Sequence, residues 1–235
     1  MHRGVALVLA GIGLAVTGCA PAVPSPGDQE DGVRFVALGD SYTIGTSVAE
    51  SERWPNQLVE RIGELELVGN PAVNGYTSRD LIERELPLVS DLQPEVVTVL
   101  VGVNDVVQGV PDATYATNVA AILDTLLTQV PASRIVCVAT PDYTLTPQGS
   151  AFGDPTRQRA GIERANAILG DACRSRDAHF VPDIFEISRL VAQDPGLVAD
   201  DGLHPSGAQY TLWVDAIAPV VAEALGTAPA TLPHE

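Results

Sequence analysis

Five short apolar runs recur along this chain of 235 residues, and segments with helical spacing separate them. The runs cover residues 33–38, 65–68, 96–101, 135–139 and 180–181. Residues that are apolar at successive positions suit strands that are buried on both faces. Because strands of this kind alternate with helices, the sequence predicts an α/β fold of three layers, in which helices cover both faces of a parallel sheet of about five strands.

Capping and breaking residues predict where several helices begin and end. Apolar residues with helical spacing precede Pro131, and a second such segment follows Pro155. The last helix is predicted over residues 206–225, because Ser206 suits an N-cap and Gly226 suits the residue after a helix.

Residues 1–18 have the features of an export signal. Arg3 gives a positive start, residues 5–16 are apolar, and small residues precede Cys19. The apolar part is too short to span a bilayer. Small residues before a cysteine resemble a bacterial lipobox, in which Cys19 becomes the lipid-bearing first residue; the alternative is an ordinary secretory signal with an incidental cysteine. We expect a cell-envelope lipoprotein anchored at Cys19, or a secreted protein if that residue carries no lipid.

The rest of the chain is expected to form one domain between two polar ends. Residues 19–32 are rich in proline and polar side chains, which suits a flexible tether. About 200 residues remain, enough for one domain with a sizeable core. We place this domain at residues 33–226 and a C-terminal tail at residues 227–235.

The charge balance argues against one class of partner. The chain has 13 Lys and Arg residues against 30 Asp and Glu residues, a formal net charge of −17, and it contains no lysine. Phosphate contacts require clustered basic residues, so nucleic acid is not an expected partner. We expect a monomer that meets the membrane only through its lipid anchor.

Two cysteines lie within the predicted domain. Cys137 belongs to an apolar strand run, and Cys173 lies near the end of a predicted helix. In an exported protein the two can form a disulfide, and the alternative is a pair of buried thiols.

Three polar clusters lie at predicted strand ends or in loops beside helices: Gly39-Asp40-Ser41, Gly102-Val103-Asn104-Asp105 and Asp201-Gly202-Leu203-His204. Reactive groups in open parallel sheets gather at the carboxyl ends of the strands, so these clusters are expected to meet. Ser41 becomes a nucleophile if an imidazole takes its proton, and the Asn104 amide can donate to an oxyanion. The structural alternatives are a helix-capping serine and an ordinary turn.

His204 is the stronger of the two histidines in the domain as a candidate base. His179 begins the last predicted strand at its amino end, on the side of the sheet away from the crevice. His204 lies three residues after Asp201, whose carboxylate can orient one ring nitrogen. Asp200 is a rival for that carboxylate, and only the pattern separates the two.

One glycine and three aromatic residues are further candidates. Gly75 can offer its backbone N–H to an oxyanion, or it is a turn glycine before a helix capped by Ser78. Tyr76, Tyr143 and Phe152 are candidates for pocket walls, or they pack within loops.

With these blocks in this order, the chain resembles the SGNH hydrolases, also called the GDSL esterase and lipase family, from Val33 to about Leu225. The resemblance implies a flavodoxin-like sheet and neither a metal nor another cofactor. It also implies these roles: nucleophile Ser41, general base His204, its partner Asp201, and an oxyanion hole made of the Ser41 N–H, the Gly75 N–H and Asn104. The sequence departs from the family pattern at Tyr42, where many members have leucine, and at Ala72, where glycine is frequent.

The resulting interpretation is a serine esterase that hydrolyses carboxylic esters through an acyl-enzyme. The expected substrate is a small-molecule or surface-displayed ester. A rival interpretation is a metal-dependent phosphoesterase, whose ligand segments the glycine-aspartate and asparagine-aspartate pairs loosely resemble. Such sites use several histidines and carboxylates, whereas this domain offers one candidate histidine. A second rival interpretation is a catalytically silent binding lipoprotein of the same fold.

Overall fold

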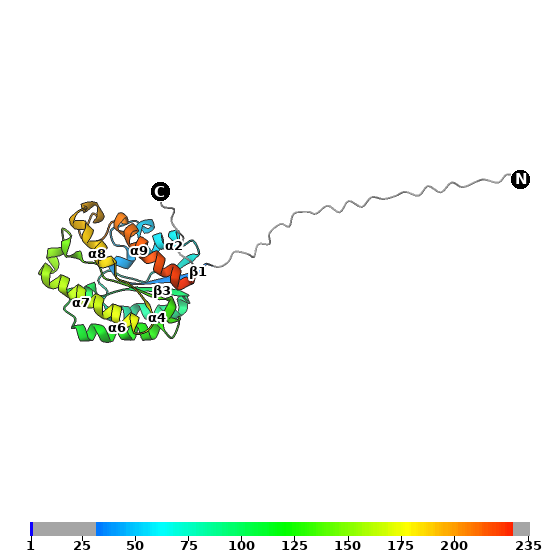
Figure 1. The fold of residues 1–235 in the computed structure, drawn as a ribbon, viewed down its shortest axis with the longest axis horizontal. Helices are drawn as coiled ribbons and strands as arrows, with labels where there is room; N and C mark the ends of the chain where they lie inside the picture. Colours follow the sequence, from blue (N-terminus) through cyan, green and yellow to red (C-terminus); the bar gives the residue numbers. More distant parts are fainter. Residues whose placement is uncertain (2–31, 228–235) are drawn as a thin grey trace. The chain divides into compact units, whose positions relative to one another are not determined.

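All five predicted strands are present in the computed structural model, which describes Met1 and residues 32–227 (Figure 1). The strands are β1 (Val33–Gly39), β2 (Leu65–Gly69), β3 (Val96–Leu100), β4 (Ile135–Val138) and β5 (His179–Val181). Their order in the sheet is β2-β1-β3-β4-β5, and every neighbouring pair is parallel. This is the doubly wound order of a flavodoxin-like sheet, so the predicted fold class is confirmed.

Helices connect the strands. The α-helices are α1 (Ser41–Ile44), α2 (Trp54–Arg61), α3 (Ser78–Asp80), α4 (Leu86–Leu92), α5 (Val103–Val107), α6 (Asp112–Leu126), α7 (Pro155–Arg174), α8 (Ile184–Ser188) and α9 (Gly207–Leu225). A π-helical turn, η2 (Leu81–Glu85), joins α3 to α4. Short 3₁₀ turns are η1 (Glu50–Glu52), η3 (Ala132–Arg134), η4 (Tyr143–Leu145), η5 (Gly149–Phe152), η6 (Arg189–Ala192) and η7 (Pro195–Leu197).

The predicted ends of the last helix are correct. The Ser206 side chain accepts a hydrogen bond from the Gln209 N–H, and Gly226 follows the helix with a φ of +76°. A serine oxygen pairs a backbone donor that the first turn leaves free, and glycine adopts the left-handed conformation without a Cβ clash. Helix α7 likewise begins at Pro155, where the missing N–H costs nothing.

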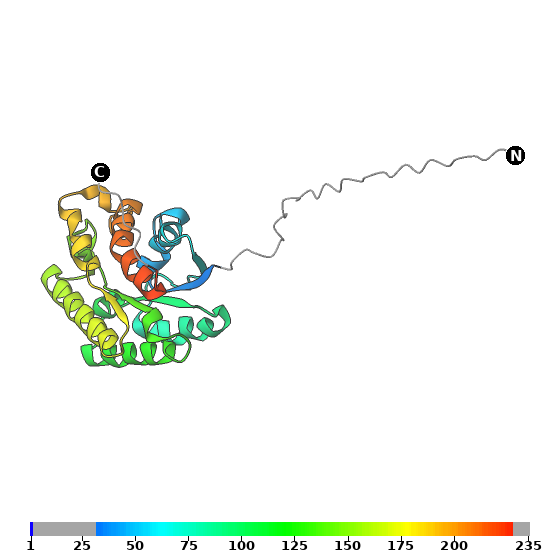
Figure 2. The same ribbon diagram turned by 45° about the vertical axis from the view of Figure 1, so that its right-hand side comes forward.

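The sheet is buried on both faces, as the continuous apolar runs predict. Alternate side chains of β1 point to opposite layers: Phe35 packs with Trp54 of α2 and Trp213 of α9, whereas Val36 packs with residues of α4, α6 and α7 such as Val119. In Figures 1 and 2, α2, α8 and α9 cover one face of the sheet, and α4, α6 and α7 cover the other. Burying a large apolar side chain stabilises a fold by about 1.5–3 kcal/mol, so each face forms a substantial core.

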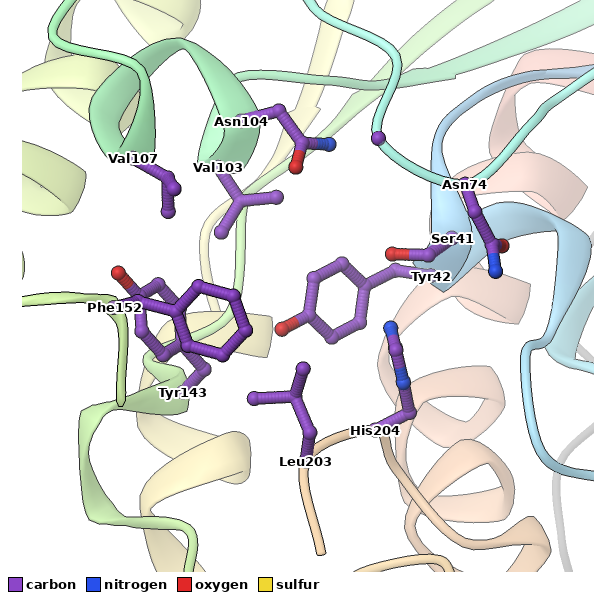
Figure 3. Close-up of a pocket in the computed structure, with 11 residues that line it drawn as sticks. Ser41, Tyr42, Asn74, Val103, Asn104, Val107, Tyr143, Phe152, Leu203 and His204 are labelled. Carbon is purple, nitrogen blue, oxygen red and sulfur yellow. The ribbon is translucent and has the colours of Figure 1, made fainter. Parts of the chain in front are cut away.

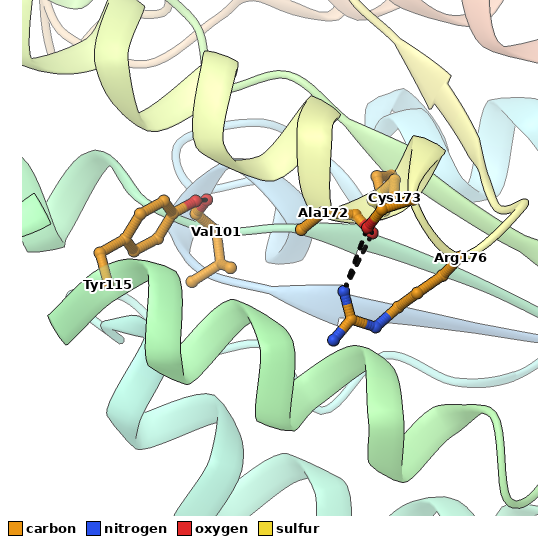
Figure 4. The surroundings of a disulfide bond; sticks show 7 residues. Val101, Tyr115, Ala172, Cys173 and Arg176 are labelled. Carbon is orange, nitrogen blue, oxygen red and sulfur yellow. Dashed lines mark hydrogen bonds between the residues drawn. A yellow bond between two sulfur atoms is a disulfide. The ribbon is translucent and has the colours of Figure 1, made fainter. Parts of the chain in front are cut away.

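A disulfide joins the sheet to the second of these layers. Cys137 of β4 bonds to Cys173 of α7, and their Cα atoms lie 6.7 Å apart (Figure 4). Both residues are fully buried, and the crosslink closes a loop with a sequence separation of 36. A crosslink of this kind typically stabilises a protein by about 2–4 kcal/mol by restricting the unfolded chain. The disulfide therefore reinforces the attachment of α7 to the sheet.

Several predictions concern parts of the chain outside the described residues. These are the export signal at residues 1–18, Cys19 with the tether that follows it, and the tail after residue 227. Within residues 32–227, none of the helices has the combination of length and apolarity that a membrane crossing needs.

Candidate active site

Ser41 begins α1 directly after β1. The N-cap of this helix is Asp40, whose Oδ1 accepts a hydrogen bond from the Tyr42 N–H at 3.0 Å. The capping interpretation of Ser41 is therefore wrong, and its hydroxyl does not serve the helix terminus. A serine hydroxyl at the first helical position beside a strand end is available for chemistry.

The turn before Ser41 packs tightly against the end of β3. Gly39 lies opposite Leu100 in the sheet register, so the two strands end at the same level. A Cβ added to Gly39 would lie 2.4 Å from the Leu100 carbonyl oxygen and from Thr43 Oγ1. Only glycine fits here. The close approach places the loop after β1 beside the loop after β3, at the point where the strand order reverses.

Asp201 and His204 form a short hydrogen-bonded pair. Asp201 Oδ2 lies 2.6 Å from His204 Nδ1, and Oδ1 accepts the backbone N–H groups of Leu203 and His204 at 2.8 and 2.9 Å. This contact leaves Nε2 on the far side of the ring. Asp200 is exposed and Asp201 is also partly open to solvent, so contact with the imidazole, and not burial, distinguishes the two aspartates.

The carboxyl of Asp201 is held in its charged form. Partial burial raises its pKa, but hydrogen bonds from the Ser47 hydroxyl, from His204 and from two backbone N–H groups outweigh that effect. The pKa of Asp201 therefore lies well below its usual range. A permanently charged carboxylate beside Nδ1 fixes the ring orientation and stabilises an imidazolium when one forms.

Asn104 and Gly75 lie beside Ser41. Asn104 belongs to α5, and its Nδ2 donates to the Tyr76 carbonyl oxygen at 2.9 Å and contacts Asp40 Oδ2 at 3.3 Å. Gly75 has a φ of +83°, and open space surrounds the position that a Cβ would occupy. Position 75 therefore favours glycine because of its backbone conformation, and not because neighbouring atoms leave no room for a side chain.

These residues surround one pocket of about 220 Å³. Its lining residues are Ser41, Tyr42, Asn74, Gly75, Val103, Asn104, Val107, Tyr143, Phe152, Leu203 and His204. Figure 3 shows the Ser41 hydroxyl and the end of the His204 ring turned toward the same part of the pocket. Within residues 32–227 no direct hydrogen bond joins the two side chains; in unliganded sites such bonds are often long and tighten when substrate binds.

The far side of the pocket is apolar. Val103 and Val107 come from α5, Leu203 precedes the histidine, and Tyr143 and Phe152 come from the loop after β4 (Figure 3). The prediction of pocket walls is thus correct for Tyr143 and Phe152.

Tyr76 does not line this pocket, so that prediction is wrong. Its ring lies beneath the Arg84 guanidinium, 5.9 Å from the cation to the ring centroid. Its backbone carbonyl, which accepts from Asn104, contributes to the site instead.

Contacts also define the roles of Ser78 and His179. The helix after Gly75 is capped by Thr77, which accepts from the Asp80 N–H, whereas the Ser78 hydroxyl bonds to buried Asp105. The prediction that Ser78 caps this helix is therefore wrong. His179 begins β5 at its amino end, as predicted, and does not line the pocket.

Three buried carboxyl groups lie near Ser41: Asp40, Glu85 and Asp105. Burial raises the pKa of Asp40 to about 7 and the pKa of Glu85 to about 8, and it raises the pKa of Asp105 as well. Glu85 Oε2 accepts the Gly39 N–H at 2.9 Å, so this carboxyl supports the turn that carries Ser41.

Two contacts of the site are not predicted by any sequence motif. Ser47 donates its hydroxyl to Asp201 Oδ2 at 2.6 Å. Tyr42 packs its ring against His204, with centroids 5.4 Å apart. The departure from leucine at Tyr42 is the only signal that pointed toward either residue.

A ligand set for a metal is not found in the described part of the chain. Across residues 32–227, no three His, Cys, Asp or Glu side chains are grouped so that they can hold a metal ion. The described residues therefore give no support to the interpretation as a metal-dependent phosphoesterase.

The doubly wound parallel sheet and the pocket lined by Ser41, Asn104 and His204 agree with the class of SGNH-type hydrolases. The chain belongs to the GDSL-like Lipase/Acylhydrolase family, whose model matches residues 37–212. It is therefore an ester hydrolase of this class. No curated protein sequence matches the chain significantly.

Solved structures share the fold. TesA superposes with a TM-score of 0.63 at 19% sequence identity, over 81% of this chain and 98% of that chain. A lipase/acylhydrolase from Enterococcus faecalis superposes with a TM-score of 0.62 at 20% sequence identity, over 84% of this chain and 98% of that chain. A variant of Axe2, an acetyl xylan esterase from Geobacillus stearothermophilus, superposes with a TM-score of 0.63 at 17% sequence identity, over 87% of this chain and 98% of that chain. At these identities the likeness concerns the fold.

The buried carboxyl of Glu85 makes stability depend on pH. Because its folded pKa of about 8 exceeds the ordinary 4.5, the folded protein holds a proton that the unfolded chain has released between these values. The free energy of unfolding should fall as the pH rises from about 5 to 8, by up to about 1.4 kcal/mol per pH unit for one proton. Asp40 acts in the same direction. Glu85→Gln should flatten this slope, measured by urea unfolding at several pH values.

The control for this experiment is Glu64→Gln, which removes a charge from an exposed position. A slope in Glu85→Gln equal to that of the unmodified protein would show that Glu85 does not carry the proton.

Proposed function

We propose that the chain is a serine carboxylesterase in which Ser41 is the nucleophile, His204 the general base and Asp201 the residue that orients the base. The observation that carries this proposal is the short Asp201–His204 contact together with a pocket that both His204 and Ser41 line. The family supports hydrolysis of esters, and the site geometry supports the assignment of roles.

The chemistry follows from these positions. Ser41 Oγ attacks the ester carbonyl carbon while His204 Nε2 takes the hydroxyl proton, and a tetrahedral oxyanion forms. When this intermediate collapses, the imidazolium gives the proton to the leaving alcohol. Water, activated by the same imidazole, then attacks the acyl-enzyme and releases the acid. Asp201 stays charged throughout and favours the imidazolium.

The oxyanion hole is proposed to consist of the Ser41 N–H, the Gly75 N–H and the Asn104 amide. Asn104 is held by its bond to Tyr76 at 2.9 Å, whereas its 3.3 Å contact with Asp40 is long. The Asn104 N–H that contacts Asp40 is therefore the one that can turn toward an oxyanion. Donors fixed before the reaction stabilise the developing charge without reorganising.

The apolar wall of the pocket supports a proposal about the acyl group. A dry cavity of about 150 Å³ lined by aliphatic and aromatic side chains holds benzene. The 220 Å³ pocket is larger, so it has space for an acyl group of roughly six to eight carbons. The alcohol part of the ester then lies toward the open side.

The role of Ser41 is tested by Ser41→Ala. Turnover of a chromogenic ester should fall by about 10⁴-fold or more, because the residual groups can only bind and polarise the ester. Labelling by a fluorophosphonate, which traps activated serines, should disappear. Ser90→Ala, at an exposed position of α4, is the matched control and should retain both properties. Unchanged turnover in Ser41→Ala would defeat the proposal, and absence of labelling in the unmodified protein would favour a silent binding protein.

The acyl proposal is tested with esters of one alcohol and increasing acyl length. For the unmodified protein, kcat/KM should rise from acetyl by up to about fourfold per methylene, since each buried methylene contributes about 0.8 kcal/mol. Val107→Phe fills the apolar side and should abolish this rise while acetyl esters are still hydrolysed. Leu88→Phe, on an exposed face of α4, controls for added bulk. An equal loss for all chain lengths in Val107→Phe would contradict the assignment.

We also propose export through residues 1–18 and lipid anchoring at Cys19, on the sequence alone. In cells that export the full chain, the protein should take up an alkyne fatty acid and sediment with membranes. Cys19→Ser should lose the label and move to the soluble fraction. If both forms remain unlabelled and soluble, the chain is an ordinary secreted protein.

A further inference from the structure

Ser47 lies six residues after the nucleophile and has an unusual backbone conformation. Its φ is +68°, in the left-handed region that residues other than glycine, asparagine and aspartate rarely adopt. Such a conformation is unfavourable for serine and persists where surrounding contacts hold it. The contact present here is the hydrogen bond from Ser47 Oγ to Asp201 Oδ2, at 2.6 Å.

This hydrogen bond differs in one respect from the others that Asp201 accepts. The remaining donors are the Leu203 N–H, the His204 N–H and the His204 ring, and all three belong to the same loop as Asp201. They set the shape of that loop but cannot set its position relative to Ser41. Among these donors, only Ser47 comes from another part of the chain, 154 residues away.

The segment that carries Ser47 is itself fixed to the nucleophile. The N–H groups of Gly45 and Thr46 both donate to the Ser41 carbonyl oxygen, at 3.1 and 3.0 Å. The Thr46 hydroxyl is hydrogen-bonded to the Asn74 side chain, next to Gly75. The three residues 45–47 therefore link the nucleophile to the loop of the oxyanion donor and to the loop of the acid and base.

We propose that Ser47 is a positioning residue for catalysis, which holds the Asp201–His204 loop in register with Ser41. This inference rests on the proposed function of those three residues. Ser47 does not touch the reacting atoms; it acts through Asp201. Two donors, the Ser47 hydroxyl and the His204 ring, meet at the same carboxylate oxygen, so the loss of one changes the direction in which the other is held.

The test is Ser47→Gly, because glycine removes the hydroxyl and also suits a φ of +68°. Because glycine adopts this backbone conformation without strain, the substitution should not destabilise the fold, and the melting temperature should not fall. We expect kcat to decrease by about tenfold with KM little changed, since a hydrogen bond to a charged group is lost outside the substrate-binding wall. The rate of fluorophosphonate labelling should decrease by a similar factor.

A spectroscopic measurement distinguishes positioning from general structural support. The downfield proton NMR resonance of the His204 Nδ1–H bonded to Asp201 should shift or broaden in Ser47→Gly. The matched control is Gln93→Gly, a residue with a φ of +45° at the end of α4 that undergoes the same type of backbone change. It should leave kcat, labelling and the resonance unchanged.

The outcomes separate this inference from the proposed function. If Ser41→Ala is inactive but Ser47→Gly has the kcat and the resonance of the unmodified protein, Ser47 has no positioning role and the inference is wrong. If Ser41→Ala remains active, the proposed function itself is wrong. If Ser47→Gly loses kcat only in proportion to a lowered melting temperature, the residue supports the fold and the inference is also overturned.

Discussion

The buried carboxyl of Asp40 is the group on which the arrangement of the active site depends. One of its oxygens accepts the Tyr42 N–H and so begins α1, and the other contacts the amide of Asn104. A carboxyl with no exposure to solvent is unfavourable unless hydrogen bonds compensate for lost hydration, and burial here raises its pKa to about 7. Because Asp40 caps the helix, the neighbouring Ser41 hydroxyl remains free. One side chain thus contacts both the turn that carries Ser41 at the end of β1 and the Asn104 amide beyond β3.

The loop that carries Asp201 and His204 reaches this site from a different direction. Asp201 and His204 precede α9, and no strand pairing aligns their loop with the ends of β1 and β3. Their internal hydrogen bonds make the loop rigid, but rigidity alone does not determine where the imidazole lies relative to Ser41. Contacts with other parts of the chain fix that position, and the hydrogen bond from Ser47 to Asp201 and the packing of Tyr42 against His204 are two of them. A shift of 1 Å between catalytic groups can reduce a rate by about 100-fold.

The sheet could be predicted from the sequence, because strands buried on both faces need continuous apolar runs. The run at residues 96–101 is an example. The candidate catalytic residues could also be identified from the sequence, since their types and order are unusual. The sequence does not determine which of two adjacent polar residues caps a helix. Asp40 and Ser41 are both suitable N-cap residues, and only the folded structure, in which Asp40 accepts the Tyr42 N–H, shows which of them caps α1. For the same reason Ser47 could not be predicted, because its partner Asp201 is brought to it only by the fold.

The apolar wall of the pocket has an ion-paired anchor of its own. Tyr143 and Phe152 lie in the loop after β4, and this loop is fixed by Asp142, whose fully buried carboxylate pairs with Arg159 and Arg189 at 3.2 and 2.9 Å. Removing either arginine would leave this buried carboxylate with fewer partners, which is unfavourable, so the two pairs hold the loop in place. The same loop also contacts the Asp201–His204 loop, because the Gln148 N–H donates to the Gly202 carbonyl oxygen at 2.9 Å. Side-chain substitutions at Tyr143 and Phe152 can therefore reshape the apolar side of the pocket while this backbone contact is kept.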